Sequence, residues 1–448
     1  MKTPMPPPDL NGILERVSEQ GIKRVVELLG NPRDVAERTY LPWDKLRHKK
    51  PPKDLTHEEW WFATRMWRDS IQRSTPLHDM NGRPFTYALP DSVLRAIDDI
   101  NTNASGQIAI SEQVTNRETR DRYLVSSLIE EAITSSQLEG ASTEHRVAKE
   151  MLRSGRPPRD RSERMIANNY AAMQQIGEYR HEKLTVDLIC EIHRIVTEGT
   201  LENPDASGRF QLPSENRIAV YDDYGELLHS PPPASELDQR VLELCDFANG
   251  SDTGAYLPPV LRAITLHFMI GYIHPFEDGN GRTARTLFYW SMLSQGFWLA
   301  EFLTVSRILK KAPAQYGRSF LLTEQDNNDL TYFHIYHLGV IQRAIKELHA
   351  HLARKMDEVR EIQRSITAMN EEFNHRQLAL LQNAVNSPLQ VYTVQSHSRS
   401  HRASPETARK DLLGLEQAAL LVKTKSGRAN AWLPVGDIVG KLHGKRDR

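Results

Sequence analysis

The sequence predicts a mainly α-helical fold that carries a single β-hairpin in its central part. Between residues 118 and 370, almost every segment repeats apolar residues at positions i, i+3 and i+4, as in RYLVSSLIEEAITSSQLEG and YLPPVLRAITLHFMIGYI. Residues 217–233 break this pattern with two short β-like runs around the turn Asp222-Asp223-Tyr224-Gly225, and they end in prolines. A chain of 448 residues is longer than a single hydrophobic core usually supports, so we expect more than one domain.

Residues 1–117 are predicted to form a helical N-terminal region with proline-rich breaks. The stretch GILERVSEQGIKRVVELL has helical apolar spacing. A later helix begins after Thr56, a good N-cap, with Glu58 and Glu59 in its first turn. Three tryptophans of that helix predict an aromatic packing face rather than a ligand site: Trp60, Trp61 and Trp67.

Residues 371–448 predict a winged helix-turn-helix domain, because three helical segments precede two short strands around a Ser-Gly turn. Ser404 is a good N-cap and Pro405 a good first residue for the third helix, and residues 404–415 take the place of the recognition helix. From residue 374 onward, twelve Lys and Arg stand against five Asp and Glu. DNA is therefore a candidate partner, through residues such as Arg402, Arg409 and Lys410. Winged helices also bind proteins or form dimers, so that alternative stays open.

Composition excludes several other classes of protein. The chain is 39% hydrophobic and 26% charged with a formal net charge of −1, which is typical of a globular protein. No run approaches the roughly 18 apolar residues of a membrane span, and the N-terminus shows no apolar signal segment. Cys190 and Cys245 lie in apolar helical patterns, as expected of reduced thiols in a cytoplasmic protein. A long helical pattern from about residue 329 can serve as a linker helix or as a homodimer surface.

The stretch IHPFEDGNGRTAR, residues 273–285, carries the residues most suited to chemistry. Gly279, Asn280 and Gly281 directly precede a helix, so backbone N–H groups and the helix N-terminus predict a phosphate-binding cradle. Arg282 and Arg285 lie three residues apart on the first turn of that helix and can reach one polyphosphate. The stretch lacks the GxxxxGK[ST] pattern of the common P-loop.

Two further side chains of this stretch predict the reaction. Asp278, next to the cradle, can hold a divalent metal that the phosphates also bind. His274 is the nearby side chain with a pKa suited to a general base at neutral pH, and Phe276 would anchor the loop in the core. A base, a metal carboxylate and a cradle without a second nucleophile predict direct transfer from a nucleotide to an incoming hydroxyl group.

The same stretch resembles the signature of the Fic family, HxFx(D/E)GNGRxxR, at every fixed position. The resemblance covers about residues 118–370 and implies an all-α core that binds ATP with Mg²⁺ or Mn²⁺. It implies transfer of AMP to a Ser, Thr or Tyr hydroxyl of a target protein, or of the enzyme itself, with release of pyrophosphate. Carried over to this chain, it makes His274 the base, Asp278 the metal ligand, residues 279–281 the anion hole, and Arg282 and Arg285 the phosphate ligands.

The hairpin resembles the family's flap, which pairs with the backbone of the target and presents its hydroxyl group. The residues assigned to this contact are Arg217, Ile218, Ala219 and Val220. One departure concerns the segment before the flap, where many relatives read GxFR and this chain reads GRFQ at residues 208–211. This departure leaves open how the start of the flap is fixed.

A second motif, SSQLEG at residues 135–140, resembles the family's inhibitory motif (S/T)xxxE(G/N). Ser135 and Glu139 lie on one face of a helix that Gly140 would end. A glutamate aimed at Arg285 would compete with the γ-phosphate, so the motif implies inhibition by an unproductive ATP pose. Glu139 could alternatively align a water molecule and remove AMP from modified proteins.

We therefore expect a self-inhibited protein adenylyltransferase. Two alternatives remain: an AMP-removing or bifunctional enzyme that uses Glu139, and a DNA-binding regulator that acts through the C-terminal domain. Transfer of a group other than AMP also stays open, because the motif binds phosphates and does not show the adenine pocket. Three other histidines, His267, His334 and His337, are interpreted as packing or hydrogen-bonding residues, since no third metal ligand is evident near the last two.

Overall fold

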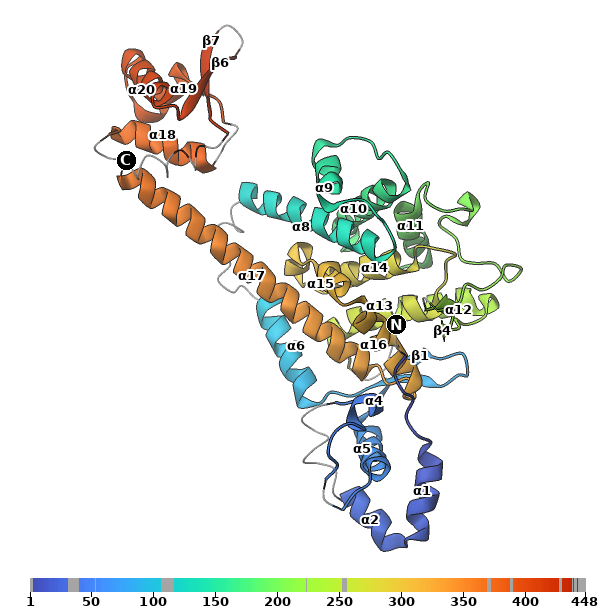
Figure 1. Cartoon of the computed structure of the whole chain (residues 1–448). Helices are drawn as coiled ribbons and strands as arrows, with labels where there is room; N and C mark the ends of the chain where they lie inside the picture. The colour runs from blue at the N-terminus through green and yellow to red at the C-terminus, as the bar shows by residue number, and fades with distance from the viewer. Residues whose placement is uncertain are drawn as a thin grey trace. The chain divides into compact units, whose positions relative to one another are not determined.

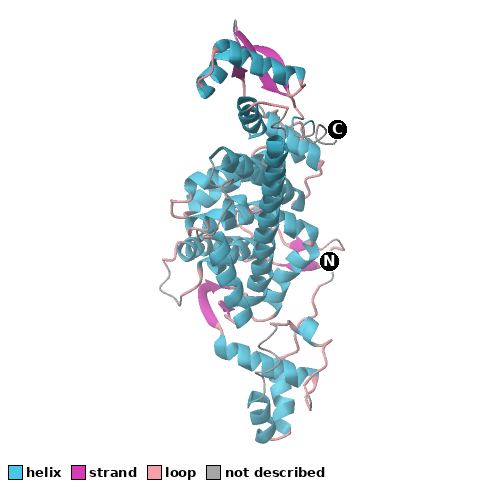
Figure 2. Ribbon diagram, turned by 90° about the vertical axis from the view of Figure 1, so that its left-hand side faces the viewer, coloured by secondary structure: helices cyan, strands magenta, loops and turns pink. Residues whose placement is uncertain are grey.

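The computed structural model describes residues 3–30, 40–52, 54–105, 117–222, 224–251, 256–368, 372–386, 390–426 and 429–436, together with 438 and 441. By its internal contacts the chain divides into two units, Met1–Leu348 and His349–Arg448, which are described separately. The domain boundaries expected at residues 117 and 370 stay predictions, and residues 370 and 371 lie outside the described residues. The predicted mainly α-helical class is confirmed (Figures 1 and 2).

The N-terminal helices form because their ends are capped by local side chains. Asp9 accepts hydrogen bonds from the first turn of α1, and Thr56 and Glu59 make a reciprocal capping box at the start of α5. Trp60 and Trp61 are buried in the small core between these helices, as predicted, whereas Trp67 is half-buried. The helices of this region are α1 (Leu10–Glu19), α2 (Ile22–Gly30), α4 (Trp43–Leu46), α5 (His57–Ile71) and α6 (Asp91–Ala104).

Between α5 and α6 the N-terminal region contains a hairpin that the sequence analysis did not predict. There, β1 (Arg73–His78) pairs antiparallel with β2 (Pro84–Tyr87). The Asp79 carboxylate closes the turn by accepting from the backbone of Asn81 and Arg83 at 2.8 Å, and Gly82 has φ +75°. The Asn-Gly pair at 81 and 82 is the sequence signal of such a hairpin. The prolines within both strands obscured it.

Two nearly fully buried helices, α13 (Pro259–Ile273) and α14 (Asn280–Ser294), form the centre of the first unit. A helix that is apolar on all sides is stable only when other helices surround it. Figure 1 shows α10, α11, α12 and α16 around this pair. The surrounding elements are α8 (Arg117–Leu138), α9 (His145–Ser154), α10 (Arg161–Tyr179), α11 (Val186–Thr197), α12 (Leu237–Ala248), α15 (Val305–Lys311) and α16 (Pro313–Gln325), with short 3₁₀ turns at Pro204–Ala206, Ala234–Glu236 and Trp298–Phe302.

The predicted hairpin at 217–233 is confirmed as β3 (Val220–Tyr221) paired antiparallel with β4 (Leu227–His229). Its turn is closed by the Asp222 carboxylate, which accepts from the backbone N–H groups of Tyr224 and Glu226. Asp223, predicted in the same turn, lies outside the described residues.

A buried polar network joins α5 to residues 326–332, which follow α16. Arg68 donates to the Tyr332 hydroxyl at 2.6 Å, and that hydroxyl donates to Asp326 at 2.6 Å. Arg65 lies 3.4 Å from the Asp326 carboxylate and 3.6 Å from that of Asp329. Removing one partner of such a buried set typically costs about 3–5 kcal/mol, because an uncompensated charge stays behind. The N-terminal helices are therefore tied to the central ones.

The predicted long helix is α17 (Thr331–Ala368), and the division between the two units falls within it. The C-terminal elements are α18 (His375–Asn386), β5 (Tyr392–Thr393), α19 (Val394–His401), α20 (Pro405–Gln417), β6 (Leu421–Ser426) and β7 (Ala429–Pro434), with strand order β5-β7-β6. Ser404 caps α20 and Pro405 is its first residue, as predicted. The short strand β5 was not predicted. The assignment of this unit as a winged helix stays a prediction.

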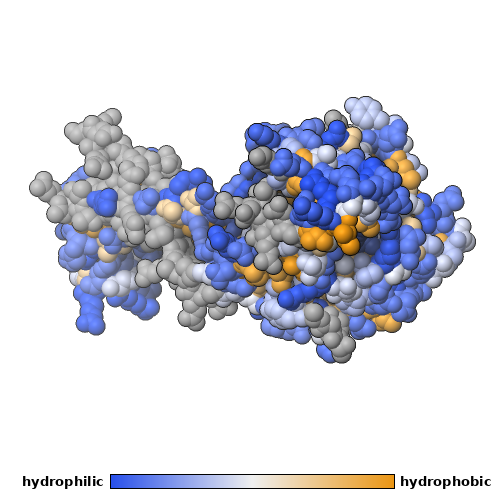
Figure 3. Space-filling model, turned by 90° about the horizontal axis from the view of Figure 1, so that it is seen from below, coloured by the Kyte–Doolittle hydropathy of each residue, from blue (hydrophilic) through white to orange (hydrophobic). Residues whose placement is uncertain are grey.

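None of the described helices is long and apolar enough to cross a membrane. On the side drawn in Figure 3, hydrophilic residues cover most of the described surface and hydrophobic ones form small groups. Both cysteines are free thiols, with Cys190 half-buried and Cys245 buried.

Three histidines are buried where α13 meets α16 and α17. The His334 ring lies 2.9 Å from the Thr265 hydroxyl, and the His267 ring lies 2.7 Å from the Tyr316 hydroxyl. His337 donates to the Phe333 carbonyl at 3.2 Å. Burial lowers the pKa of His334 and His337 to about 3 and that of His267 well below its usual value. Their interpretation as packing and hydrogen-bonding residues is confirmed.

These histidines predict a loss of stability in mild acid. Between pH 6.5 and 3 the unfolded chain binds protons that the folded chain does not, so stability present above pH 6.5 falls as the pH falls. At pH 5, His334 and His337 should each cost about 2 kcal/mol. We expect the thermal midpoint of His337→Gln to fall less steeply between pH 7 and 5 than that of the wild type. The exposed residue His48, changed to Gln, serves as control, and equal slopes for all three proteins would refute the assignment.

Candidate active site

The predicted base, His274, sits at the C-terminus of α13 in a left-handed conformation with φ 48° and ψ 55°. Its backbone N–H still donates to Ile270 at 3.0 Å, and its ring Nδ1 lies 3.4 Å from the Gly271 carbonyl oxygen. A carbonyl can only accept, so this contact favours the tautomer with the proton on Nδ1. The lone pair of Nε2 is then available to take a proton.

Electrostatics keep this imidazole neutral. Burial lowers the pKa of His274 to about 4, and the positive charges of His229 and Arg217 act in the same direction. A histidine with this pKa is unprotonated at neutral pH, which is the state that a general base requires.

The loop between α13 and α14 is held by internal contacts. Phe276 is fully buried, as predicted, and stacks on the His193 ring at 3.7 Å with an interplanar angle of 2°. His193 accepts from the Gly208 backbone at 3.0 Å and donates to the Asp278 carbonyl at 2.9 Å. Sequence analysis missed His193, because a lone histidine on an apolar helix face gives no sign of its partner.

The predicted anion cradle is the N-terminus of α14. Gly279 has φ +85°, and a Cβ there would lie 2.6 Å from the Thr197 methyl group, so only glycine fits. The Asn280 side chain binds both the N–H and the carbonyl of Phe276, at 3.0 and 2.8 Å. Only the backbone of Asn280 can therefore contribute to anion binding, together with the other N–H groups of the first turn, which have no intrahelical partner.

Arg282 is buried with unused donors. Its Nη1 donates to the Val196 carbonyl at 2.6 Å, while Nε and Nη2 have no hydrogen-bond partner among the described residues. The nearest carboxylate is that of Asp278, at 3.7 Å. Burial lowers the pKa of Arg282, and the negative charges of Asp278 and Glu139 offset this only in part. Such a group is suited to an anion that enters from outside.

The predicted inhibitory residues surround Arg285. The guanidinium donates to the Ser135 hydroxyl at 2.8 Å, to the Ser135 carbonyl at 3.0 Å and to the Glu139 carboxylate at 2.9 Å. Burial alone would lower the pKa of Arg285, but the charge of Glu139 raises it. Gly140 follows with φ +89°, beyond the end of α8 at Leu138. The structure thus brings together Ser135, Glu139 and Arg285 as predicted from the motif.

The Glu139 carboxylate also lies over the cradle. A Cβ at Gly281 would be 2.2 Å from Glu139 Oε1 and 2.7 Å from its carboxyl carbon. The carboxylate therefore occupies space next to the first turn of α14 that an anion bound to this turn and to Arg285 would use. The ion pair with Arg285 and the positive helix end stabilise it there.

Asp278 is partly exposed beside the cradle. Its carboxylate lies 3.2 Å from Arg161, whose Nε donates to the Thr200 carbonyl at 2.7 Å. The described residues contain no group of three His, Cys, Asp or Glu that could hold a metal alone. A single exposed carboxylate fits a cation that shares phosphate oxygens and water, which is how Mg²⁺ is usually bound with a nucleotide.

The residues assigned to the flap point in different directions. The Arg217 guanidinium turns inward and donates to the carbonyls of Ile273 and His274 at 2.7 and 3.0 Å. Ile218 is exposed, and Ala219 and Val220 are half-buried. Gln211, where the chain departs from the GxFR pattern, accepts from Arg217 and donates its N–H to the Pro275 carbonyl at 2.9 Å. This pair fixes the start of the hairpin.

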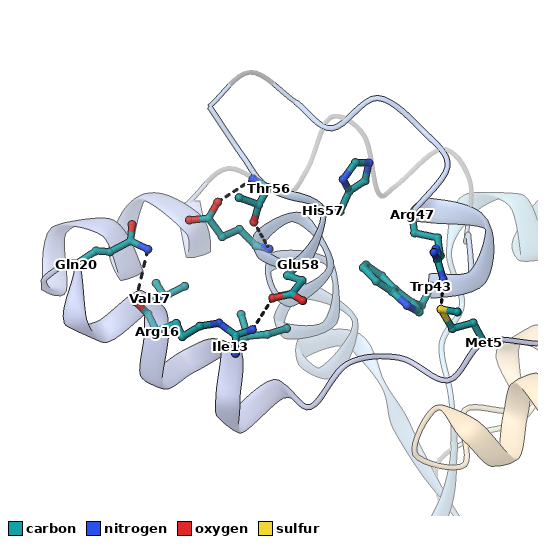
Figure 4. A pocket seen from close by; sticks show the side chains of 11 residues that line it. Met5, Ile13, Arg16, Val17, Gln20, Trp43, Arg47, Thr56, His57 and Glu58 are labelled. Carbon is teal, nitrogen blue, oxygen red and sulfur yellow. Dashed lines mark hydrogen bonds and ion pairs between the residues drawn. The ribbon is translucent and has the colours of Figure 1, made fainter.

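A hollow with a volume of about 710 Å³ lies away from these residues, between α1, α4 and α5 (Figure 4). Its charged groups already have partners within the chain: Arg16 pairs with Glu58, and Glu59 closes the Thr56 capping box. None of the residues that predict chemistry lines it. The residues that line it are Met5, Ile13, Arg16, Val17, Gln20, Trp43, Arg47, Thr56, His57, Glu58 and Glu59.

Residues 183–292, which include α13 and most of α14, match the Fic/DOC family. A protein adenylyltransferase Fic of Nematostella vectensis is 34% identical over 118 residues, which cover 26% of this chain and 25% of that protein. Protein adenylyltransferase fic-1 of Caenorhabditis elegans is 31% identical over 117 residues, covering 26% and 21%. The chain thus matches about a quarter of the length of these relatives. A Fic family protein of Desulfovibrio desulfuricans is 16% identical with a TM-score of 0.49, covering 77% of this chain and 96% of that one.

The contact between Glu139 and Arg285 predicts tighter nucleotide binding when the carboxylate is removed. We expect Glu139→Ala to bind a non-hydrolysable ATP analogue with Mg²⁺ about 10- to 100-fold more tightly, because one charge-assisted hydrogen bond of about 1.5–3 kcal/mol becomes available to the nucleotide. Isothermal titration calorimetry measures the difference. Glu130→Ala, on the same helix but paired with His145, is the control and should bind like the wild type. Equal affinity of Glu139→Ala and the wild type would contradict this assignment of Glu139.

Proposed function

We propose that this chain is a self-inhibited protein adenylyltransferase, which transfers AMP from ATP to a Ser, Thr or Tyr hydroxyl of a target protein or of itself. The observation that carries the proposal is the combination of a neutral His274 with the unused donors of the buried Arg282, at opposite ends of one short loop. The relatives named protein adenylyltransferase support this activity for the Fic domain. Its extension to the whole chain is part of the proposal.

The proposed step is an in-line displacement at the α-phosphorus. Nε2 of His274 accepts the proton of the target hydroxyl while that oxygen forms a bond to phosphorus. The bond between the α-phosphorus and the bridging oxygen breaks, and pyrophosphate leaves with the electron pair. The first turn of α14 and Arg282 stabilise the negative charge that develops on the phosphate oxygens.

Asp278 would hold a divalent cation, Mg²⁺ or Mn²⁺, which neutralises part of the phosphate charge when bound. Arg161 now neutralises this carboxylate from 3.2 Å and would have to release it. The exposed hydrophobic residues of the hairpin support its role as the surface that receives the target: Ile218, Tyr221, Tyr224 and Leu227. Glu139 would keep Arg285 from the nucleotide until it is displaced.

The transfer reaction can be tested with α-labelled ATP and Mg²⁺. We expect Glu139→Ala to label itself or lysate proteins at least about tenfold more strongly than the wild type, since its phosphate site is free. His274→Ala in the Glu139→Ala background should show no label, whereas His48→Ala should label normally. A silent Glu139→Ala protein would refute the transferase. Release of labelled AMP from modified protein by the wild type, lost in Glu139→Ala, would instead support the removal reaction.

We propose DNA as the ligand of the C-terminal unit, because Arg402, Arg409 and Lys410 are all exposed at α20 or just before it. Binding of the full chain to a double-stranded oligonucleotide should weaken as salt rises. Replacing both Arg409 and Lys410 by Ala should lower the slope of log K against log salt by about 2, since each phosphate contact contributes about 0.9. Replacing the exposed Arg83 and Arg95 of the first unit is the control. Unchanged slopes would favour a protein partner.

A further inference from the structure

The carbonyl end of α13 is bound by side chains that come from the hairpin. The last carbonyl groups of a helix have no intrahelical partner. Here the His229 ring lies 2.8 Å from the Tyr272 carbonyl, and Arg217 donates to the carbonyls of Ile273 and His274 at 2.7 and 3.0 Å. Three consecutive carbonyl groups, ending with that of the proposed base, are thus bound by two side chains.

These two side chains belong to the two legs of one hairpin. Arg217 precedes β3, and His229 is the last residue of β4, where it faces Val220 across the strand pair. Arg217 is also fixed at the base of the hairpin, since it donates to the Pro232 carbonyl at 2.8 Å and to the Gln211 side chain. A displacement of the hairpin therefore acts on the end of α13 at both legs.

The backbone at His274, which these hydrogen bonds hold, has an unfavourable conformation. His274 has a positive φ of 48°, which is uncommon and unfavourable for a residue with a side chain. Such a conformation persists only where its surroundings impose it. The hydrogen bond from Arg217 to the His274 carbonyl fixes the peptide group that follows this strained residue. Cationic donors at a helix C-terminus also interact favourably with the helix dipole.

The contacts of His229 require its charged form. One ring nitrogen faces the Tyr272 carbonyl and the other faces the Glu324 carboxylate of α16 at 2.7 Å, and both groups are acceptors. Burial alone would lower the pKa of His229, and the charge of Arg217 acts in the same direction, but the hydrogen bond and the charge of Glu324 raise it overall. The other groups around this ring are the Tyr272 side chain and His274.

We propose that Arg217 and His229 are positioning residues that clamp the carbonyl end of α13 to the hairpin, so that docking of a target strand on the hairpin and the orientation of His274 are one coupled event. This inference rests on the proposed transfer reaction. The clamp is complete while His229 is protonated. Because its pKa is raised, the contact is fully present below the usual pKa of a histidine and is lost as the pH rises through the raised value.

The test uses transfer kinetics in the Glu139→Ala background. We expect Arg217→Ala to lower kcat by on the order of 10²-fold with little change in KM for ATP, because a misplaced base affects chemistry and not nucleotide binding. The kcat of Arg217→Lys should lie between those of the parent Glu139→Ala protein and of Arg217→Ala, because an ammonium group cannot bind both carbonyls and Gln211 together. In the parent protein kcat should fall as the pH rises through the pKa of His229, and this fall should disappear in His229→Gln, which keeps one donor that does not titrate. Arg194→Ala, a surface arginine paired with Glu191, is the matched control.

A second measurement does not depend on transfer. The pKa of His274 can be followed by NMR through its ring Cε1–H signal, assigned by its loss in His274→Ala. We expect this pKa to rise from about 4 toward its usual value in Arg217→Ala and in His229→Gln, because a positive charge is removed and the ring is released. An unchanged pKa together with unchanged kcat would overturn the clamp while leaving the transferase intact. A raised pKa in a protein that transfers nothing would support the clamp and refute the proposed function.

Discussion

The site depends on one constraint, which is that a short loop joins the C-terminus of one buried helix to the N-terminus of the next. The carbonyl end of α13 carries acceptors without intrahelical partners, and the N-terminus of α14 carries donors without intrahelical partners. Only residues 274–279 separate these two ends along the chain. The first end requires cationic donors, and the hairpin supplies them as Arg217 and His229. The second end requires an anion, and Glu139 supplies one. The hairpin thus supplies partners for the C-terminus of α13, and the proposed inhibitory motif supplies one for the N-terminus of α14.

This arrangement also explains why the loop sequence has so little freedom. Gly279 must adopt a positive φ beside Thr197. The side-chain amide of Asn280 must accept from the N–H of Phe276 and donate to its carbonyl. Phe276 in turn must stack on His193, which holds the Asp278 carbonyl. Each of these residues positions the backbone, and the groups that we propose to bind phosphate are mainly the N–H groups that this backbone presents. Few side chains are proposed to act on a nucleotide: His274, Asp278, Arg282 and Arg285.

Sequence reasoning reached the residues whose role is local, and it reached the distant pair Glu139 and Arg285 only through the family resemblance. It failed on other residues whose partner is distant. The glycine pattern, the helix periods and the caps at Thr56 and Ser404 are encoded within a few residues, and each was predicted correctly. His193 and His229 were missed, because their partners lie 85 and 43 residues away along the chain. Arg217 was placed in the hairpin, but its inward direction depends on α13. The hairpin at β1 and β2 was missed although its Asn-Gly turn is local, because prolines masked the strand pattern.

The anchoring of α8 bears on how the proposed inhibition can be relieved. The buried Glu131 accepts from the Ser306 backbone at 3.0 Å and from its hydroxyl, and Ser136 donates to the Met165 carbonyl at 3.1 Å. Withdrawing the whole helix would leave these groups unpaired, together with Arg285, at about 1–3 kcal/mol for each unsatisfied group. Glu139, by contrast, follows the last residue of α8, and its side chain is 26% exposed. Rotating this one side chain away from Arg285 breaks a single ion pair and leaves the rest of the helix in place. We therefore expect relief to require a local change at residues 139 and 140 rather than the removal of α8.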